Sequence, residues 1–391
     1  MQNYNVAIWK NPAYWYTVLW MMYYMGGTLY AVGSFISKAI LAMILVVSFY
    51  HMFTCLGYKD NPPMLKGVAA IIFLVSFYGI FRLLGPSYFG IPKFLFQKNI
   101  YMSLLPIFSF YYYTRKGYLK EKDMIIFAFV FVVFTYVVYL KDVANRSLVT
   151  GREVGDMTVN SGYNFIGLLP FVYFFRKKPV WFFSILFFVW FFTILCMKRG
   201  AIISGLAATL MLFWGYFKNS KRGVRIGALV LVSVFIVVIV HYVQGLMNDN
   251  SYFALRYQQT MEGNASGREE MYPMFFHYLF HENTVITALV GGGIDYSLAR
   301  FTMGAHSDWF QIAIDMGLVG ILFYIYYWRN FVKTIKQIGK ENSCYTILLI
   351  VFVIDFLKAL FSFSINDRPI TTTCILGFCL AAPFIMKQKE I

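Results

Sequence analysis

Apolar segments about as long as a bilayer's hydrocarbon core is thick recur along the whole sequence, separated by short polar breaks. Because a helix rises about 1.5 Å per residue, about twenty apolar residues are enough to cross a core roughly 30 Å thick. Of the 391 residues, 59% are hydrophobic and only 13% are charged, about half the charged share of a typical soluble domain. The sequence therefore predicts an all-α, polytopic membrane protein in which residues 1–391 form a single transmembrane domain.

Twelve of these apolar segments are long enough to be expected as transmembrane helices, the sixth being the shortest. They cover residues 14–32, 36–56, 65–84, 94–113, 124–140, 163–175, 180–197, 201–217, 226–243, 309–328, 345–363 and 370–386.

Lys and Arg residues in the short loops predict the orientation, because cytoplasmic loops retain positive charge during insertion. With twelve crossings, the basic clusters fall on one side, at 115–122, 176–178, 218–225, 329–340 and 387–389. That side is expected to be the cytoplasm, which also receives both termini, whereas the long hydrophilic loop 244–307 between spans nine and ten lies outside. The net charge of +16 is then largely an orientation signal, and it gives little support to nucleic-acid binding.

A second group of cations lies on the outer side, where few acids accompany it. Any one of these residues could be an ordinary loop cation solvated by water or lipid phosphate. As a set at the membrane edge they favour an anionic ligand, and the arginine fork matches phosphate oxygens with two hydrogen bonds. The group, which predicts a polyanionic ligand such as pyrophosphate, comprises Arg146, Arg152, Lys198, Arg199, Arg256, Arg268, Arg300 and Arg368.

The outer loop contains a segment whose apolar residues recur at helical spacing from Met271 to Leu279. This spacing predicts an interfacial amphipathic helix within 244–307. Ser266 could cap it with Glu269 three residues later, which would place Arg268 in the first turn near exposed backbone donors. An ordinary capped surface helix would show the same spacing.

His306 stands at the outer mouth of the tenth span, after a glycine turn at 290–296 and two residues before Asp308. Interfacial histidines are often structural, but an imidazole titrates near neutral pH and can act as a base or orient a hydroxyl group. Asp308 and Glu269 are alternative bases. Deeper in the membrane, Asp355 and Lys358 lie three residues apart and are expected to form a buried structural pair, with a proton relay as the alternative.

The order of these motifs resembles the O-antigen ligase and Wzy-type O-antigen polymerase superfamily. The resemblance covers about residues 164–328 and rests on Lys198-Arg199-Gly200, Ser266-Gly267-Arg268 and Gly304-Ala305-His306-Ser307-Asp308-Trp309, followed by Gly317 and Gly320. It implies a metal-independent, inverting glycosyltransferase of the GT-C type that needs no cofactor. The enzyme would work at the periplasmic face of the bacterial cytoplasmic (inner) membrane on undecaprenyl-pyrophosphate-linked oligosaccharide and polysaccharide.

The resemblance also implies roles for individual residues. Arg199 and Arg268 are expected to hold the lipid pyrophosphate, and His306 is expected to orient or deprotonate the acceptor hydroxyl. Looser matches extend the pyrophosphate-binding set to Lys198, Arg146, Arg152 and Arg300. Membrane lipid and a chain-length regulator protein are the further partners that a surface-polysaccharide polymerase would meet.

Polymerase and ligase share these motifs and differ in the acceptor, which is a lipid-linked repeat unit for a polymerase and the lipid A core for a ligase. The richness in Phe, Tyr and Ile favours an O-antigen polymerase, with the ligase as the alternative. A protein of another class, a flippase for lipid-linked oligosaccharide, would carry charges along a path through both halves and often a repeat. Here the notable charges gather at one face.

Overall fold

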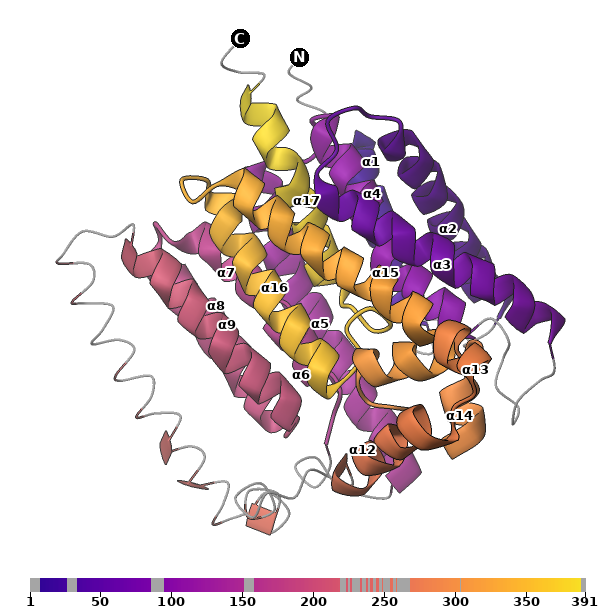
Figure 1. Cartoon of the computed structure of the whole chain (residues 1–391). Coiled ribbons are helices and arrows are strands. Elements are labelled where there is room, and N and C mark those ends of the chain that lie inside the picture. The colour runs from indigo at the N-terminus through magenta and orange to yellow at the C-terminus, as the bar shows by residue number, and fades with distance from the viewer. Residues whose placement is uncertain are drawn as a thin grey trace. The chain divides into compact units, whose positions relative to one another are not determined.

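The computed structural model describes residues 8–26, 34–85, 95–150, 158–218, 268–302 and 304–387, together with isolated positions between 219 and 267. Throughout these residues the regular structure is helical, and no strand occurs among them (Figure 1). The all-α prediction is confirmed. The ninth expected span, 226–243, lies outside the continuously described residues, so the count of twelve spans and the placement of the termini stay predictions.

Helices follow one another with short connections along the described chain. Those before residue 219 are η1 (Ile8–Lys10), α1 (Pro12–Tyr24), α2 (Phe35–Leu56), α3 (Pro63–Leu84), α4 (Leu95–Arg115), α5 (Glu121–Thr150), α6 (Gly162–Ile166), α7 (Leu169–Val172), η2 (Tyr173–Phe175), α8 (Pro179–Leu195) and α9 (Arg199–Lys218). The later ones are α12 (Arg268–His277), η3 (Tyr278–Glu282), α13 (Val285–Val290), α14 (Tyr296–Phe301), α15 (Asp308–Ile338), α16 (Ser343–Phe361) and α17 (Ile370–Lys387).

Among the described residues, six helices are long and apolar enough to cross a membrane: Phe35–Leu56, Pro63–Leu84, Glu121–Leu148, Arg199–Lys218, Asp308–Ile338 and Ser343–Phe361. Shorter apolar helices cover Gly162–Phe175, Pro179–Leu195 and Ile370–Ala381. Each overlaps an expected span. The sixth, expected at 163–175, is divided into α6, α7 and η2, because Gly167 ends α6 and Pro170 lacks the N–H group that a continuous helix needs.

The chain divides into two compact units. Unit 1 combines Met1–Asp123 with Pro273–Ile391, and unit 2 is Met124–Tyr272. In unit 1, α17 packs against α4 and α15 packs against α3. The α3–α15 contact is close because Gly67 has no side chain: a Cβ there would lie 3.1 Å from Tyr327 Cα. In unit 2, α6 packs against both α8 and α9.

The tenth expected span is not one straight helix. Inside α15, Gly317 has a non-helical backbone with φ 61° and ψ −156°. In a straight helix Asp308 and Tyr324 would be about 24 Å apart. Instead, Tyr324 Oη donates to Asp308 Oδ2 at 2.9 Å, and the rings of Trp309 and Tyr324 lie 4.7 Å apart. The helix therefore has two limbs, 308–316 and 318–338, which fold back on each other.

This fold-back corrects the expected span 309–328. The second limb is about 31 Å long at about 1.5 Å per residue, which is enough to cross the hydrocarbon core by itself. Gly317 is required at the bend because a left-handed backbone is strained for other residues and a Cβ would lie 2.5 Å from Gly291 N. The segment that precedes Gly317 is a short limb that places the His306 motif beside the second limb.

Candidate active site

The backbone around His306 is held firmly while its side chain is exposed. The Ala305 N–H donates to Gln311 Oε1 at 3.2 Å, and Ser307 Oγ donates to the Ala359 carbonyl at 3.2 Å. His306 itself has a left-handed backbone with φ 48°, and its ring lies 5.9 Å from that of Phe363. Such a conformation costs a non-glycine residue about 1–3 kcal/mol and tends to occur at functional sites. The geometry thus presents an imidazole on a constrained backbone.

Asp308 ties this motif to the loop between α16 and α17, residues 362–369. Its carboxylate is buried, and Oδ2 accepts hydrogen bonds from Tyr324 Oη at 2.9 Å, Ser364 N at 2.9 Å and Ile365 N at 3.1 Å. Three donors on one oxygen favour the ionised form as an acceptor. These contacts make Asp308 a residue that positions the loop beside His306, and its expected role as a base stays a prediction.

The same loop makes ionic contacts with α16 that the sequence did not reveal. Asp355 Oδ2 is 2.8 Å from Nη2 of Arg368, a residue expected among the outer cations and here fully buried. That Nη2 also donates to Tyr327 Oη at 2.7 Å. Lys358 Nζ lies 3.4 Å from Asp367 Oδ2. Asp355 and Lys358, which were expected to pair with each other, each have a partner on loop 362–369, and their direct pairing stays a prediction.

A second buried network fixes the first limb of α15. The Asp315 carboxylate accepts the backbone N–H groups of Asp295 at 3.2 Å and Ser297 at 2.8 Å. Asp295 in turn pairs with Arg82 of α3, whose Nε is 3.1 Å from Oδ2. Burial raises the pKa of Asp295 and the Arg82 charge opposes that rise. Sequence reasoning missed these residues, although a charge inside an apolar segment, such as Arg82 or Asp315, is itself a signal.

The expected glycine turn at 290–296 is confirmed. Gly291 and Gly293 have positive φ angles of 74° and 96°. The N–H groups of Gly292 and Gly293 donate to the carbonyls of Ile314 and Asp315, at 3.1 Å and 2.8 Å. A Cβ on Gly291 would lie 2.3 Å from the Asp315 carbonyl oxygen, so the turn needs glycine to approach the bend of α15.

Two further predictions concern residues near this turn. A helix is present where one was expected from the apolar residues Met271 to Leu279: α12 continues into η3, with Met271, Phe275 and Tyr278 buried. Its interfacial, amphipathic character stays a prediction. Arg300 of α14 is exposed, and its Nη2 lies 3.0 Å from Glu282 Oε2. It was expected to face few acids, yet it has an acidic partner. Exposed pairs of this kind contribute little to stability, because water and salt screen them.

In unit 2, Lys198 and Arg199 occupy a tight turn, as expected. Only three residues separate the end of α8 from Arg199, the first residue of α9. A hydrogen bond from Val159 N to the Cys196 carbonyl at 3.0 Å holds residue 159 against this turn, and both basic side chains are half-buried. A helix N-terminus carries partial positive charge, and the first turn of α9 contains no acid. The two cations therefore add to a positive helix end, which favours an anion.

The remaining pyrophosphate-binding candidates lie in unit 2 or outside the described residues. Arg268 is the half-buried first residue of α12, and Arg146 is half-buried on α5. One turn after Arg268, burial raises the pKa of Tyr272 while the Arg268 charge lowers it. Arg152 and Ser266 lie outside the described residues, so the predicted Ser266 cap is untested. The candidate set thus divides into Arg146, Lys198, Arg199 and Arg268 in unit 2, and Arg300, His306 and Asp308 in unit 1.

The acidic side chains of these networks are bound by cations, hydroxyls and backbone N–H groups. Within the described ranges, no group of three or more His, Cys, Asp or Glu residues is placed to hold a metal ion. Metal independence of the reaction stays a prediction.

Part of the chain matches a known protein family. Residues 182–325 match the family model described as O-antigen ligase. The match includes Arg199, Arg268, the glycine turn and the His306 motif. A search of the curated proteins found no match for this chain.

The apolar helices and the family match together define an integral membrane protein of lipopolysaccharide-related function. Within that class, the chain carries an O-antigen ligase family region over residues 182–325, which supports its place in the O-antigen polymerase and ligase superfamily. The resemblance stated from the motifs is thereby confirmed. The family is common to polymerases and ligases and suggests an enzyme that transfers glycans from lipid-linked substrates.

Proposed function

We propose that this protein is an O-antigen, or surface-polysaccharide, polymerase of the bacterial inner membrane. It joins undecaprenyl-pyrophosphate-linked repeat units by inverting glycosyl transfer at the periplasmic face. The observation that carries the proposal is the His306 motif: an exposed imidazole on a left-handed backbone whose neighbours Ala305 and Ser307 are hydrogen-bonded in place. This motif lies within the residues that match the O-antigen ligase family.

In the proposed reaction the growing glycan moves from its lipid pyrophosphate to a hydroxyl at the nonreducing end of a new lipid-linked repeat unit. His306 orients that hydroxyl or accepts its proton. The hydroxyl oxygen forms a bond to the anomeric carbon while the bond to the pyrophosphate oxygen on the opposite side breaks, so the anomeric centre is inverted. The pyrophosphate leaves with the bonding electron pair.

Arg199 and Arg268 hold the pyrophosphate and stabilise the charge that builds on it as it leaves. The location of Arg199 at the positive end of α9 supports this role. Lys198, Arg146 and Arg152 assist electrostatically. Arg300 contributes less, because Glu282 already neutralises it. No metal ion or cofactor takes part in the proposed scheme, and a chain-length regulator protein is a proposed partner.

The second candidate function is that of a ligase, which would transfer the finished glycan to the lipid A core. The description of the matching family favours it, and the chemistry at the donor would be the same. The family match points to neither a flippase nor another transporter, so transport is not supported.

A strain that lacks the gene separates these functions by the glycans it makes. Loss of a polymerase leaves single repeat units on the lipid A core. Loss of a ligase leaves lipid-linked polymer and an uncapped core. A strain that accumulates lipid-linked repeat units facing the cytoplasm would contradict both proposals, because the defect would then precede any periplasmic transfer.

A further inference from the structure

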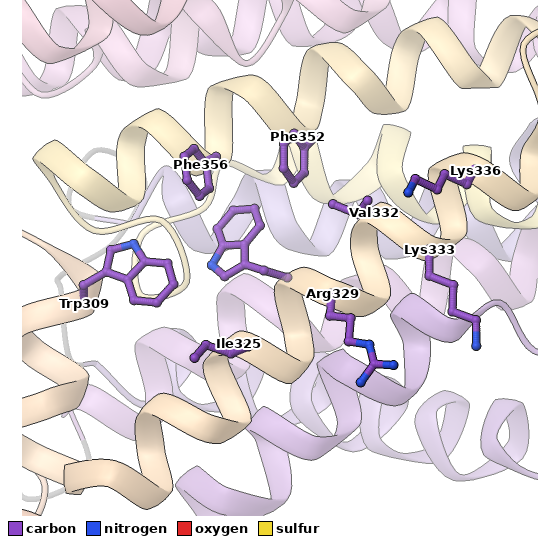
Figure 2. A pocket seen from close by; sticks show the side chains of 9 residues that line it. Trp309, Ile325, Arg329, Val332, Lys333, Lys336, Phe352 and Phe356 are labelled. Atoms are coloured by element: carbon purple, nitrogen blue, oxygen red, sulfur yellow. The ribbon is translucent and has the colours of Figure 1, made fainter.

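A groove runs along α15 and α16, from Trp309, the residue that follows Asp308, to Lys336. Its volume is about 500 Å³, which falls within the usual range of about 300–1,000 Å³ for ligand pockets. All of the residues that line it belong to unit 1. They are Trp309, Ile325, Trp328, Arg329, Val332, Lys333, Lys336, Phe352 and Phe356 (Figure 2).

One part of the groove is apolar. Ile325, Trp328 and Val332 recur at helical spacing on the second limb of α15, so they share one face. Across from them, the rings of Phe352 and Phe356 on α16 lie 5.4 Å and 5.3 Å from that of Trp328, both edge to face. This wall of rings and aliphatic groups suits a hydrocarbon chain.

The other part is basic. Arg329, Lys333 and Lys336 follow one another at intervals of about one turn and are exposed. In Figure 2 the two lysines lie at the end of the groove away from Trp309 and Phe356. Among the described residues, none of the three cations takes part in an ion pair, and no acid lines the groove. The groove therefore offers uncompensated positive charge next to an apolar wall.

The positive charge that orients cytoplasmic loops does not by itself account for three cations beside an apolar groove. Lys177, Lys178 and Lys340 belong to the same set of predicted cytoplasmic cations, yet none of them lines the groove. What distinguishes Arg329, Lys333 and Lys336 is the aromatic surface beside them. Basic pockets between transmembrane helices on the cytoplasmic side bind anionic lipid head groups.

We propose that this groove binds one anionic phospholipid of the inner leaflet, with its phosphate at Arg329, Lys333 and Lys336 and an acyl chain along Trp328, Phe352 and Phe356. The two lysines lie at the end of the groove away from Trp309, so the lipid phosphate would lie away from the His306 motif proposed above for glycan transfer (Figure 2). Bound lipid would brace α15, because the ring of Trp328 lies 5.8 Å from Tyr324, whose hydroxyl holds Asp308. The lipid would thus stabilise the helix that positions the His306 motif.

The test measures lipid binding by the purified full-length protein. Native mass spectrometry in mild detergent compares dioleoylphosphatidylglycerol with dioleoylphosphatidylcholine, which has the same chains and no net charge. Each basic residue near an anionic head group contributes about a five-fold factor in affinity, so the triple variant R329Q/K333Q/K336Q should bind phosphatidylglycerol on the order of 100-fold more weakly. The matched control K177Q/K178Q/K340Q removes the same number of cytoplasmic charges outside the groove and should bind like the native protein.

A second variant, Val332→Trp, fills the apolar part and leaves the three cations in place. It should also weaken phosphatidylglycerol binding, and it tests the proposal if the triple variant fails to fold. Equal binding of phosphatidylglycerol by the native protein and by both groove variants would overturn the proposal. An equal loss of phosphatidylglycerol binding in the control variant would also overturn it, as would equally tight binding of phosphatidylcholine. The proposal would likewise fail if a polyprenyl phosphate displaced phosphatidylglycerol from this groove. None of these readouts requires glycan transfer, so the proposed function can fail independently.

Discussion

Asp308 offers the sharpest test of how the fold supports the proposed chemistry. If this residue positions loop 362–369, its contribution to stability comes from the three hydrogen bonds that Oδ2 accepts. Asp308→Ala leaves three donors without this acceptor in a buried site, and each unsatisfied donor costs about 1–3 kcal/mol. Because neighbouring effects are not additive, we expect a loss of about 3–5 kcal/mol in the free energy of unfolding.

Asp308→Asn keeps an oxygen in nearly the same place. Hydrogen bonds to charged groups contribute about 1.5–3 kcal/mol and neutral ones about 0.5–1.5 kcal/mol, so the three bonds together weaken by about 3 kcal/mol or more. A neutral amide costs less to bury than a carboxylate, which offsets part of this loss, so the Asn variant should be more stable than the Ala variant. Loop 362–369 would stay attached, and chain extension should remain measurable. A base, by contrast, cannot be replaced by an amide, so the Asn variant separates the two roles.

The assay pairs unfolding of the purified protein in mixed micelles with the glycan ladder of a complemented deletion strain. Asp60→Ala is the control, because Asp60 is exposed in a predicted cytoplasmic loop and should change the free energy of unfolding by no more than about 0.5 kcal/mol. An Asn variant that is as stable as the native protein but makes no polymer would refute the positioning role and favour Asp308 as a base.

The other predictions concern the proposed donor site, the imidazole and the bend of α15. Arg199→Ala and Arg268→Ala should each abolish chain extension while the protein still accumulates in the membrane; polymers of native length from well-expressed variants would exclude the pyrophosphate role. His306→Ala should lose activity, whereas His306→Gln should retain some if the ring mainly orients the hydroxyl, and unchanged turnover in both would remove His306 from the site. Gly317→Ala should destabilise the fold by about 3 kcal/mol or more, because backbone strain adds to a Cβ placed 2.5 Å from Gly291 N. The control Gly339→Ala has the same strain at φ 78° but open space, so it should cost only about 1 kcal/mol, and equal losses would mean that the close approach at the bend is unimportant.

Much of the architecture could be predicted because it depends on local properties. The expected segments 36–56 and 65–84 agree with α2 and α3 within two residues, since a bilayer demands continuous apolar helices of a set length. The turn at Lys198 and Arg199 followed in the same way from two apolar segments with almost nothing between them. The motif order also sufficed to predict the superfamily.

Partners far apart in the chain could not be predicted in this way. Asp355 and Lys358 suit each other at three residues' separation, yet the loop after α16 folds back and supplies Arg368 and Asp367 as partners. Charge and spacing along one helix indicate which contacts are possible there, but they do not say which other segment will reach the same place.

The apolar segments, their lengths and the positions of the basic loops were determined by the sequence alone, because each depends on residues within a few turns of one another. Only the tertiary structure decided that Gly317 bends α15, that Asp308 meets loop 362–369, and that α15 and α16 enclose a groove. Those features depend on which surfaces come together after the helices form. Around Asp308, for example, the contacts join residues up to 57 positions apart in the chain.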